Sequence, residues 1–320
     1  MILTFLGTSS GVPTKTRNVT GIALSESVGR AWYLIDCGEA TQHQILHTYL
    51  SLNALQAIFI THVHGDHCYG LPGILASAGM AGRRDPLKII APSGIKEWCE
   101  STQTHTQFYL PFELEFISTD QLPTIEFENT LVTLTKLSHR VPSYAYTFEE
   151  KRVEANLNAE KLKMDGIPQG SLWGKIKNGL DAEYEGRLIK SEEYLIYNNK
   201  PGKIVISGDN DQPGLLTDSC NGCDVLVHEA TFTKDMAIKV GSGVGHSYAG
   251  LVAEFAQINK VPNLVLTHFS ARYQSDIEKT PSIADIYNEA KQVYKGRLFM
   301  ASDFTQYKLE KSGDFFENGS

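Results

Sequence analysis

Four side chains that can bind a metal ion lie within six residues, directly after a short apolar segment at residues 57–60. They are His62, His64, Asp66 and His67. In an extended chain alternate side chains point the same way, so His62 and His64 can converge on one ion. Gly65 lets the backbone turn, so that Asp66 and His67 can face a second ion. Imidazoles with a carboxylate suit zinc or a similar metal better than calcium or magnesium, which prefer oxygen. The cluster therefore predicts a metal site.

One loop cannot supply all the ligands of two ions, so further ligands must come from elsewhere in the chain. Three candidates follow predicted strands in the same way as the first cluster: His139, Asp209 and His268. Open α/β folds carry out their chemistry outside the carboxyl ends of strands, where these side chains would meet. Three other histidines lack this context and are expected to be ordinary side chains: His43, His47 and His105.

The elements that must position these residues are predicted from short segments rich in β-branched and aromatic residues, separated by turn signals. The predicted strands are 2–6, 31–35, 57–60, 87–90 and 130–134 in the first half, and 203–206, 225–227, 264–266 and 298–300 in the second. Stretches between them, such as 247–259, suit amphipathic helices. Two sheets with helices outside them are the economical α/β arrangement.

The stretch 149–199 departs from this pattern and is predicted to be an insertion without sustained strands. The chain carries a net charge of −8, which argues against a nucleic-acid enzyme unless basic residues cluster locally. Basic residues do cluster at 161–177, a segment with a net charge of +3, which leaves a net charge of −11 for the rest of the chain. Its lysines are Lys161, Lys163, Lys175 and Lys177. A solvated surface excursion is the alternative interpretation of this charge.

The composition is that of an ordinary globular chain of 320 residues, 42% hydrophobic and 21% charged. It contains no signal-peptide pattern and no run of eighteen apolar residues, so we expect a protein that is neither exported nor membrane-spanning. An odd number of irregularly spaced cysteines predicts reduced thiols and a cytoplasmic location. Cys220 and Cys223 form a C-x-x-C pair without the second pair of a zinc ribbon, and we assign them no metal or redox role.

The T-H-x-H-x-D-H pattern after a strand, with later His, Asp and His, resembles the metallo-β-lactamase superfamily. Further motifs extend over nearly the whole chain: PTKTRN at 13–18, HVHGDHCYGLPG at 62–73, HEAT at 228–231, His246, and SARY at 270–273. Together they resemble the ribonuclease Z family of tRNA 3′-processing endonucleases. The resemblance implies one domain over 1–320, a four-layer αβ/βα sandwich. It also implies that 150–199 is an inserted flexible tRNA-binding arm, with a Gly-Ile-Pro segment at 166–168.

The same resemblance implies two zinc ions per subunit. One would be held by His62, His64, His139 and Asp209, and the other by Asp66, His67, Asp209 and His268, with Asp209 bridging. Asp66 would accept the proton of the attacking water or orient that water. His246, paired with Glu229, would stabilise the transition state or protonate the leaving 3′ oxygen. Where the family has a His-Ser-Thr motif, this chain has His246-Ser247-Tyr248, so the histidine is kept and the threonine is replaced by tyrosine. Glu229 as a purely structural carboxylate is the alternative.

The substrate implied by the resemblance is precursor tRNA, bound by a homodimer in which the arm of one subunit grips tRNA cut by the other. The RNA-contacting residues would be Lys15, Arg17, Asn18 and Arg272, together with the four arm lysines. Lys15 and Arg17 could instead be surface charges, and Arg272 could pair with an acid of the fold.

Two other functions compete with a zinc-dependent endoribonuclease. One is a general phosphodiesterase or another hydrolase, because a fold does not determine a substrate. The other is a non-catalytic RNA-binding protein with structural zinc. That alternative is disfavoured because structural zinc sites are closed four-ligand cages, often rich in thiolates, whereas this ligand set is paired and poor in cysteine.

Overall fold

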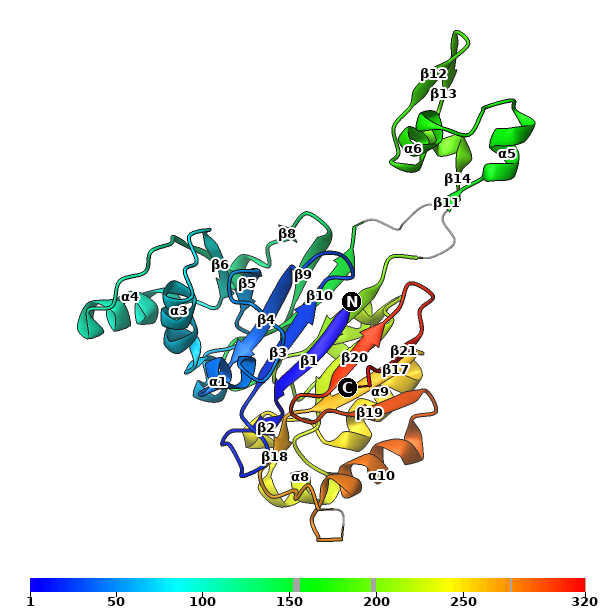
Figure 1. Ribbon diagram of the computed structural model, residues 1–320. Coiled ribbons are helices and arrows are strands. Elements are labelled where there is room, and N and C mark those ends of the chain that lie inside the picture. The colour runs from blue at the N-terminus through cyan, green and yellow to red at the C-terminus, as the bar shows by residue number, and fades with distance from the viewer. Residues whose placement is uncertain (152–155, 197–199, 277, 320) are drawn as a thin grey trace.

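The computed structural model describes residues 1–151, 156–196, 200–276 and 278–319. Within these residues two large mixed β-sheets form the body of the molecule (Figure 1). The first has eight strands in the order β21-β20-β1-β3-β4-β5-β6-β7, of which β4 to β7 are parallel. Its strands are β1 (Ile2–Gly7), β3 (Gly21–Ser25), β4 (Trp32–Cys37), β5 (Leu55–Phe59), β6 (Leu87–Ala91), β7 (Leu114–Ser118), β20 (Gln306–Leu309) and β21 (Phe315–Glu317).

The second sheet has seven strands among the described residues, in the order β19-β17-β16-β15-β10-β9-β8, with β15, β16, β17 and β19 parallel. Its strands are β8 (Ile125–Glu126), β9 (Thr130–Leu137), β10 (Ser143–Glu150), β15 (Lys203–Ile206), β16 (Val225–Glu229), β17 (Asn263–Thr267) and β19 (Arg297–Met300). A separate parallel pair, β2 (Ser9–Ser10) with β18 (Phe269–Ser270), joins the first loop of the chain to the segment after β17.

Helices cover the outer face of each sheet, which gives four layers. Beside the first sheet lie α1 (Thr41–Ile45), α2 (Gly65–Cys68), α3 (Leu71–Met80) and α4 (Ile95–Thr106), and beside the second lie α7 (Thr217–Cys220), α8 (Lys234–Val240), α9 (Ala249–Ile258) and α10 (Ile283–Val293). Short 3₁₀ helices are η1 (Thr119–Gln121), η2 (Ser191–Tyr194), η3 (Pro213–Leu216) and η4 (Ser242–Val244). None of the described helices is both long and apolar enough to cross a membrane.

Three apolar clusters account for the layering. The central one lies between the sheets and combines side chains such as Phe5 and Phe59 of the first sheet with Phe148 and Val227 of the second. The two outer clusters lie between each sheet and its own helices. Burial of apolar surface on both faces explains why the parallel strands are almost continuously hydrophobic. It also makes the two sheets a rigid support for the loops at their ends.

All nine predicted strands are present, with ends displaced by at most a few residues. The helix expected within 247–259 is α9. Sequence analysis did not identify β3, β7, β10, β20 or β21 as strands. The two-sheet α/β prediction is confirmed.

Residues 156–196 form a small substructure with its own apolar cluster, which sequence analysis did not predict. Leu162, Ile167, Trp173 and Ile176 are buried within it. Figure 1 shows this substructure standing away from the two-sheet body. Its elements are β11 (Asn156–Leu157), α5 (Ala159–Met164), α6 (Ser171–Lys177), β12 (Ala182–Tyr184), β13 (Arg187–Ile189) and β14 (Leu195–Ile196), with η2 between the last two. The predicted segment 150–199 also includes 152–155 and 197–199, which lie outside the described residues.

Candidate metal centre and active site

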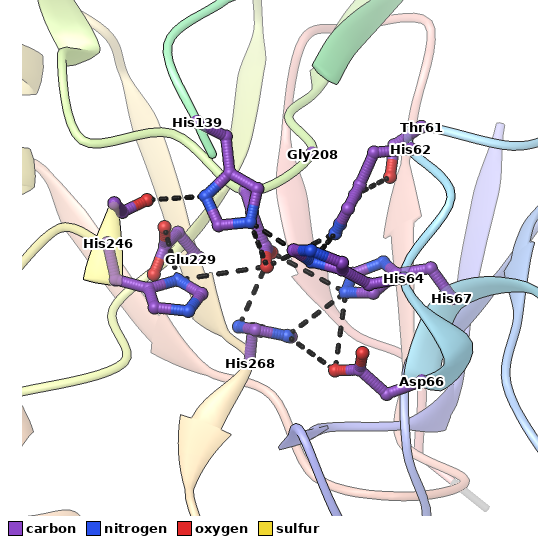
Figure 2. Close-up of polar contacts among 12 residues, drawn as sticks. Thr61, His62, His64, Asp66, His67, His139, Gly208, Glu229, His246 and His268 are labelled. Atoms are coloured by element: carbon purple, nitrogen blue, oxygen red, sulfur yellow. Dashed lines mark hydrogen bonds and ion pairs between the residues drawn. The ribbon is translucent and has the colours of Figure 1, made fainter. Parts of the chain in front are cut away.

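The predicted metal ligands meet at one end of the two sheets, in loops that follow strands (Figure 2). His62 and His64 follow β5, Asp66 and His67 lie in α2, and His139, Asp209 and His268 follow β9, β15 and β17. Gly208 allows two of these loops to approach, since a Cβ there would lie 2.6 Å from the Cβ of Thr61. Together with His246, these side chains form three groups among the described residues. Within each group the ligand atoms lie within 4.8 Å of one another.

The first group consists of His62, His64, His139 and Asp209. His62 Nε2 lies 3.0 Å from His64 Nδ1, and His139 Nε2 lies 3.2 Å from the same nitrogen. His139 is oriented by a hydrogen bond between its Nδ1 and the carbonyl oxygen of Gly245, 2.7 Å apart. Burial lowers the pKa of His62 well below its usual value, and neighbouring imidazoles act in the same direction. His62 is therefore neutral, with a nitrogen lone pair available to a metal ion.

The second group consists of Asp66, His67 and His268. His67 Nε2 lies 3.2 Å from His268 Nε2 and 3.5 Å from Asp66 Oδ2, and His268 Nε2 lies 3.4 Å from the same oxygen. His268 has a left-handed backbone conformation, with φ of 57°. This conformation places its ring at the end of β17.

Asp209 stands between the two groups and presents a different oxygen to each. Its Oδ2 lies 3.5 Å from His62 Nε2 and 3.8 Å from His139 Nε2. Its Oδ1 lies 3.6 Å from His67 Nε2 and 3.5 Å from His268 Nδ1. Asp209 is only 3% exposed, and a buried carboxylate needs compensating charge or metal coordination. Asp209 therefore presents one carboxylate oxygen to each group.

The spacing of the donor atoms fits tetrahedral metal binding. Zinc–nitrogen bonds of about 2.0–2.1 Å place the ligands of a tetrahedral site about 3.3–3.4 Å apart. The close contacts in the two groups, from 3.0 to 3.8 Å, bracket this value. Neutral imidazole nitrogens that face one another at such distances compete for one proton unless a cation lies between them. The donor set is therefore chemically suited to metal ions.

Asp36 is a supporting residue that sequence analysis did not identify. It lies in β4 and accepts hydrogen bonds from the backbone N–H and hydroxyl of Thr61 at 2.7 and 2.8 Å. His67 Nδ1 lies 2.7 Å from the same carboxylate, which leaves Nε2 facing the metal group. Carboxylates in this position fix the tautomer and orientation of a metal-binding histidine. The available signal was one acid within the otherwise apolar WYLIDC strand.

The half-buried His246 and the buried Glu229 form a pair beside Asp209. His246 Nδ1 lies 3.1 Å from Glu229 Oε1 and 3.7 Å from Asp209 Oδ2. Burial alone would lower the pKa of His246, but the carboxylates of Glu229 and Asp209 outweigh it and raise the pKa to about 9. Glu229 also accepts the backbone N–H of Asn210 at 3.0 Å and the hydroxyl of Thr231. His246 belongs to a third close group with Asp209 and His268, so it lies beside both metal groups.

The loop at 11–18 lies next to the second metal group, but its predicted RNA-binding residues differ in accessibility. Lys15 is exposed, and Asn18 is half-buried, with its amide donating to the carbonyl oxygen of Glu39 at 3.0 Å. Arg17 differs from the expectation of direct RNA contact, since it is only 5% exposed. Its guanidinium donates to the Ser270 carbonyl oxygen at 3.2 Å. Arg17 therefore holds the loop against β18 in this structure.

Arg272 is exposed at the edge of the site. Its Nη1 donates to Ser270 Oγ at 3.2 Å, and its Cζ lies 5.9 Å from the centre of the Phe232 ring, which in turn lies 6.1 Å from the His246 ring. Among the described residues Arg272 makes no ion pair with an acid of the fold. Its charge is thus available to an anionic ligand.

The lysines of the 156–196 substructure differ in exposure. Lys163, Lys175 and Lys177 are exposed, whereas Lys161 is half-buried, with its Nζ 4.8 Å from the Tyr194 ring centre.

The histidines and cysteines left out of the site lie apart from it. His43 and His47 contact each other edge to face, and His105 Nδ1 lies 2.8 Å from the carbonyl oxygen of Ser101. Cys220 and Cys223 are free thiols, buried in the cluster under the second sheet.

Comparison with known proteins identifies the family. The family described as "Anti-Pycsar protein Apyc1" matches residues 1–153, a match that stops before Asp209 and His268. The chain is 49% identical over 313 residues to ribonuclease Z of Pseudomonas putida (strain GB-1), covering 98% of each chain. It is 39% identical over 298 residues to ribonuclease Z of Bacillus subtilis (strain 168), covering 92% of this chain and 97% of that one. The crystal structure of human tRNase Z, short form, matches with a TM-score of 0.65 and 24% identity, covering 97% of this chain and 100% of that one. The resemblance inferred from the motifs is confirmed: this chain belongs to the ribonuclease Z family, with a metallo-β-lactamase fold.

Proposed function

We propose that this protein is a metal-dependent endoribonuclease that removes the 3′ trailer from precursor tRNA. The products are a tRNA with a 3′-hydroxyl and a trailer with a 5′-phosphate. The observation that carries the proposal is Asp209, whose two oxygens face two different histidine-rich groups. Two metal sites that share a ligand suit in-line displacement at phosphorus. Whole-chain similarity to proteins named ribonuclease Z supports precursor tRNA as the substrate.

The cofactor is proposed to be two zinc ions per subunit. One zinc is assigned to His62, His64, His139 and Asp209, and the other to Asp66, His67, Asp209 and His268. The imidazole-rich donor set and its near-tetrahedral spacing support zinc over magnesium, which demands octahedral oxygen coordination. When bound, the ions would lower the pKa of a shared water and stabilise charge on the attacking and leaving oxygens.

The chemical step then depends on three side chains. Asp66 orients the attacking water and accepts its proton. His246, protonated and held by Glu229, donates a proton to the leaving 3′ oxygen or stabilises charge on it. The 3.1 Å contact between His246 Nδ1 and Glu229 supports this role, because it fixes the ring with Nε2 free for the substrate. Glu229 is thus more than a structural carboxylate in this proposal.

Substrate binding is assigned to exposed cations near the site and in the substructure. Lys15, Asn18 and Arg272 are proposed to meet the RNA around the cleaved phosphate. Arg17 contributes by holding the loop in place. The segment 150–199 is proposed to be the tRNA-binding arm, with Lys161, Lys163, Lys175 and Lys177 contacting phosphates. Local positive charge in an acidic protein supports this assignment.

The active form is proposed to be a cytoplasmic homodimer in which the arm of one subunit grips tRNA cut by the other. The separation of the 156–196 substructure from the two-sheet body in Figure 1 is compatible with an arm that reaches a second subunit. Five free cysteines are compatible with a reducing compartment.

A comparison of substrates tests the function against its competitors. Purified protein is incubated with a precursor tRNA bearing a 3′ trailer, with the matching mature tRNA and with a small phosphodiester, each with and without chelator. We expect rapid chelator-sensitive cleavage of the precursor and slow hydrolysis of the small diester. A general phosphodiesterase would cut all substrates without preference for the precursor, and a non-catalytic RNA-binding protein would cut none.

A further inference from the structure

A backbone contact joins the loop at 11–18 to the second metal group. The backbone N–H of Gly11 donates to Asp66 Oδ2 at 2.7 Å, across 55 residues of sequence. Gly11 has φ of 72°, a left-handed conformation that glycine adopts without strain. A Cβ at this position would meet no atom within 4 Å, so backbone conformation alone disfavours other residues here.

The residues that lead into this loop, and Arg17 within it, form hydrogen bonds with the segment that follows His268. Ser9 and Ser10 pair with Phe269 and Ser270 in the β2–β18 ladder, and the Phe269 N–H donates to the Thr8 carbonyl oxygen at 2.9 Å. Arg17 adds its hydrogen bond to the Ser270 carbonyl oxygen. One short stretch of chain therefore contacts Asp66 directly and His268 through the adjoining strand. Both are ligands in the second metal group, and neither belongs to the first.

We propose that Gly11 is a positioning residue for Asp66, and that the loop at 11–18 and the second metal site move together. A carboxylate oxygen carries two lone pairs, so Oδ2 can accept the Gly11 N–H and still bind an ion. Every hydrogen bond or ion pair that Asp66 makes among the described residues involves Oδ2. The Gly11 contact thus restricts the rotation of the carboxylate and holds Oδ2 toward His67 and His268.

The consequence is a link between substrate recognition and metal binding, which rests on the proposed function in that the loop meets RNA. If the loop shifts when the trailer binds, Asp66 shifts with it. Coupling between two binding events is reciprocal, so metal at the second site must change the affinity for RNA by the same factor by which RNA changes the affinity for that metal. The ligands of the first site, His62, His64, His139 and Asp209, make no hydrogen bond or ion pair with the loop among the described residues, so the first site should be less sensitive to the loop than the second.

The test is a metal titration of full-length variants at Gly11, with Gly29 as the matched control. Gly29 also has positive φ, 82°, and open space around its Cβ position, but it lies in the connection between β3 and β4, at the opposite end of β4 from Asp36. Gly11→Val should strain the backbone most, because a β-branched residue rarely adopts positive φ, whereas Gly11→Asn should be tolerated. Metal-free protein is titrated with Co²⁺, whose absorption reports each site, and then with Zn²⁺.

We expect Gly11→Val to weaken the binding of one ion by about 10- to 100-fold, the usual effect of losing a group that orients a metal ligand. The other ion should bind as in the unaltered protein, Gly11→Asn should restore much of the loss, and Gly29→Val should change neither affinity. Two unchanged affinities in Gly11→Val, or equal losses in Gly11→Val and Gly29→Val, would overturn the proposal. Should Gly11→Val fail to fold, Gly11→Ala replaces it and must bind the second ion more weakly than Gly11→Asn. The titration needs no RNA, so it stands even if the unaltered protein does not cleave precursor tRNA.

Discussion

Replacing Asp209 by alanine should abolish metal-dependent cleavage, because this carboxylate faces both metal groups. Its oxygens lie 3.5 Å from His62 Nε2 and 3.5 Å from His268 Nδ1, so the substitution removes a charged ligand from each site. At an effective dielectric constant of about 20, unit charges about 4 Å apart interact by about 4 kcal/mol. That energy corresponds to roughly three orders of magnitude in affinity, and a divalent ion in direct contact would lose at least as much.

The assay measures bound metal by elemental analysis after gel filtration, together with cleavage of precursor tRNA. We expect Asp209→Ala to retain one equivalent of metal or less and to cleave at least about 10³-fold more slowly. His43→Ala is the matched control, since His43 is exposed on α1 and lies outside every metal group of the described residues. An Asp209→Ala protein that keeps two equivalents of metal and its activity would refute the bridging assignment.

Three further predictions concern the arm, the loop and the proton donor. Replacing 156–196 by a short Gly-Ser linker should weaken precursor cleavage while sparing hydrolysis of a small diester. If the arm acts across a dimer, mixing this protein with Asp209→Ala should restore cleavage. No recovery from a verified mixed dimer would contradict the action of the arm on the other subunit. Lys15→Ala should reduce the slope of log affinity against log salt by about 0.7–0.9 if Lys15 contacts a phosphate, and an unchanged slope in filter-binding assays would indicate a merely solvated side chain. Burial lowers the pKa of His246, but Glu229 and Asp209 outweigh it and raise the pKa to about 9. The protonated form of His246 is therefore lost as pH rises through that value, and bound cations would shift this loss to lower pH. Cleavage should therefore fall on the alkaline side in the unaltered protein, and His246→Asn should be slower and lack this fall; an identical pH profile in the variant would exclude His246 as the proton donor.

The metal ligands were predictable from sequence because their signal is local. Each follows a strand end, and parallel strands bring such ends together at one edge of a sheet, so His139, Asp209 and His268 could be added to the first cluster. The strands of the central layers were predictable for a similar reason, since burial on both faces requires continuous apolar segments.

The supporting contacts were not predictable because they depend on partners far apart in the chain. Arg17 carries a charge that suggests RNA contact, yet its partner, the Ser270 carbonyl oxygen, lies 253 residues away. Asp36 has an ordinary sequence context, and its role emerges only when Thr61 and His67 lie beside it. Strand β10 was missed although its pairing with β9 and β15 is extensive, because it directly precedes the insertion and was partly assigned to it. The separate core of the 156–196 substructure depends on the packing of Leu162, Trp173 and Tyr194, which are scattered among charged residues.

Metal-dependent cleavage of precursor tRNA at the junction with its 3′ trailer is the activity proposed for this protein. The most direct measurement maps both new ends of a doubly labelled precursor after incubation with the purified protein, with chelator and with zinc restored. We expect one cut at that junction, with a 3′-hydroxyl on the tRNA and a 5′-phosphate on the trailer; cleavage should be lost with chelator and recovered with zinc. Cleavage that leaves a 3′-phosphate or a cyclic phosphate on the tRNA, or that persists in Asp209→Ala, would contradict it.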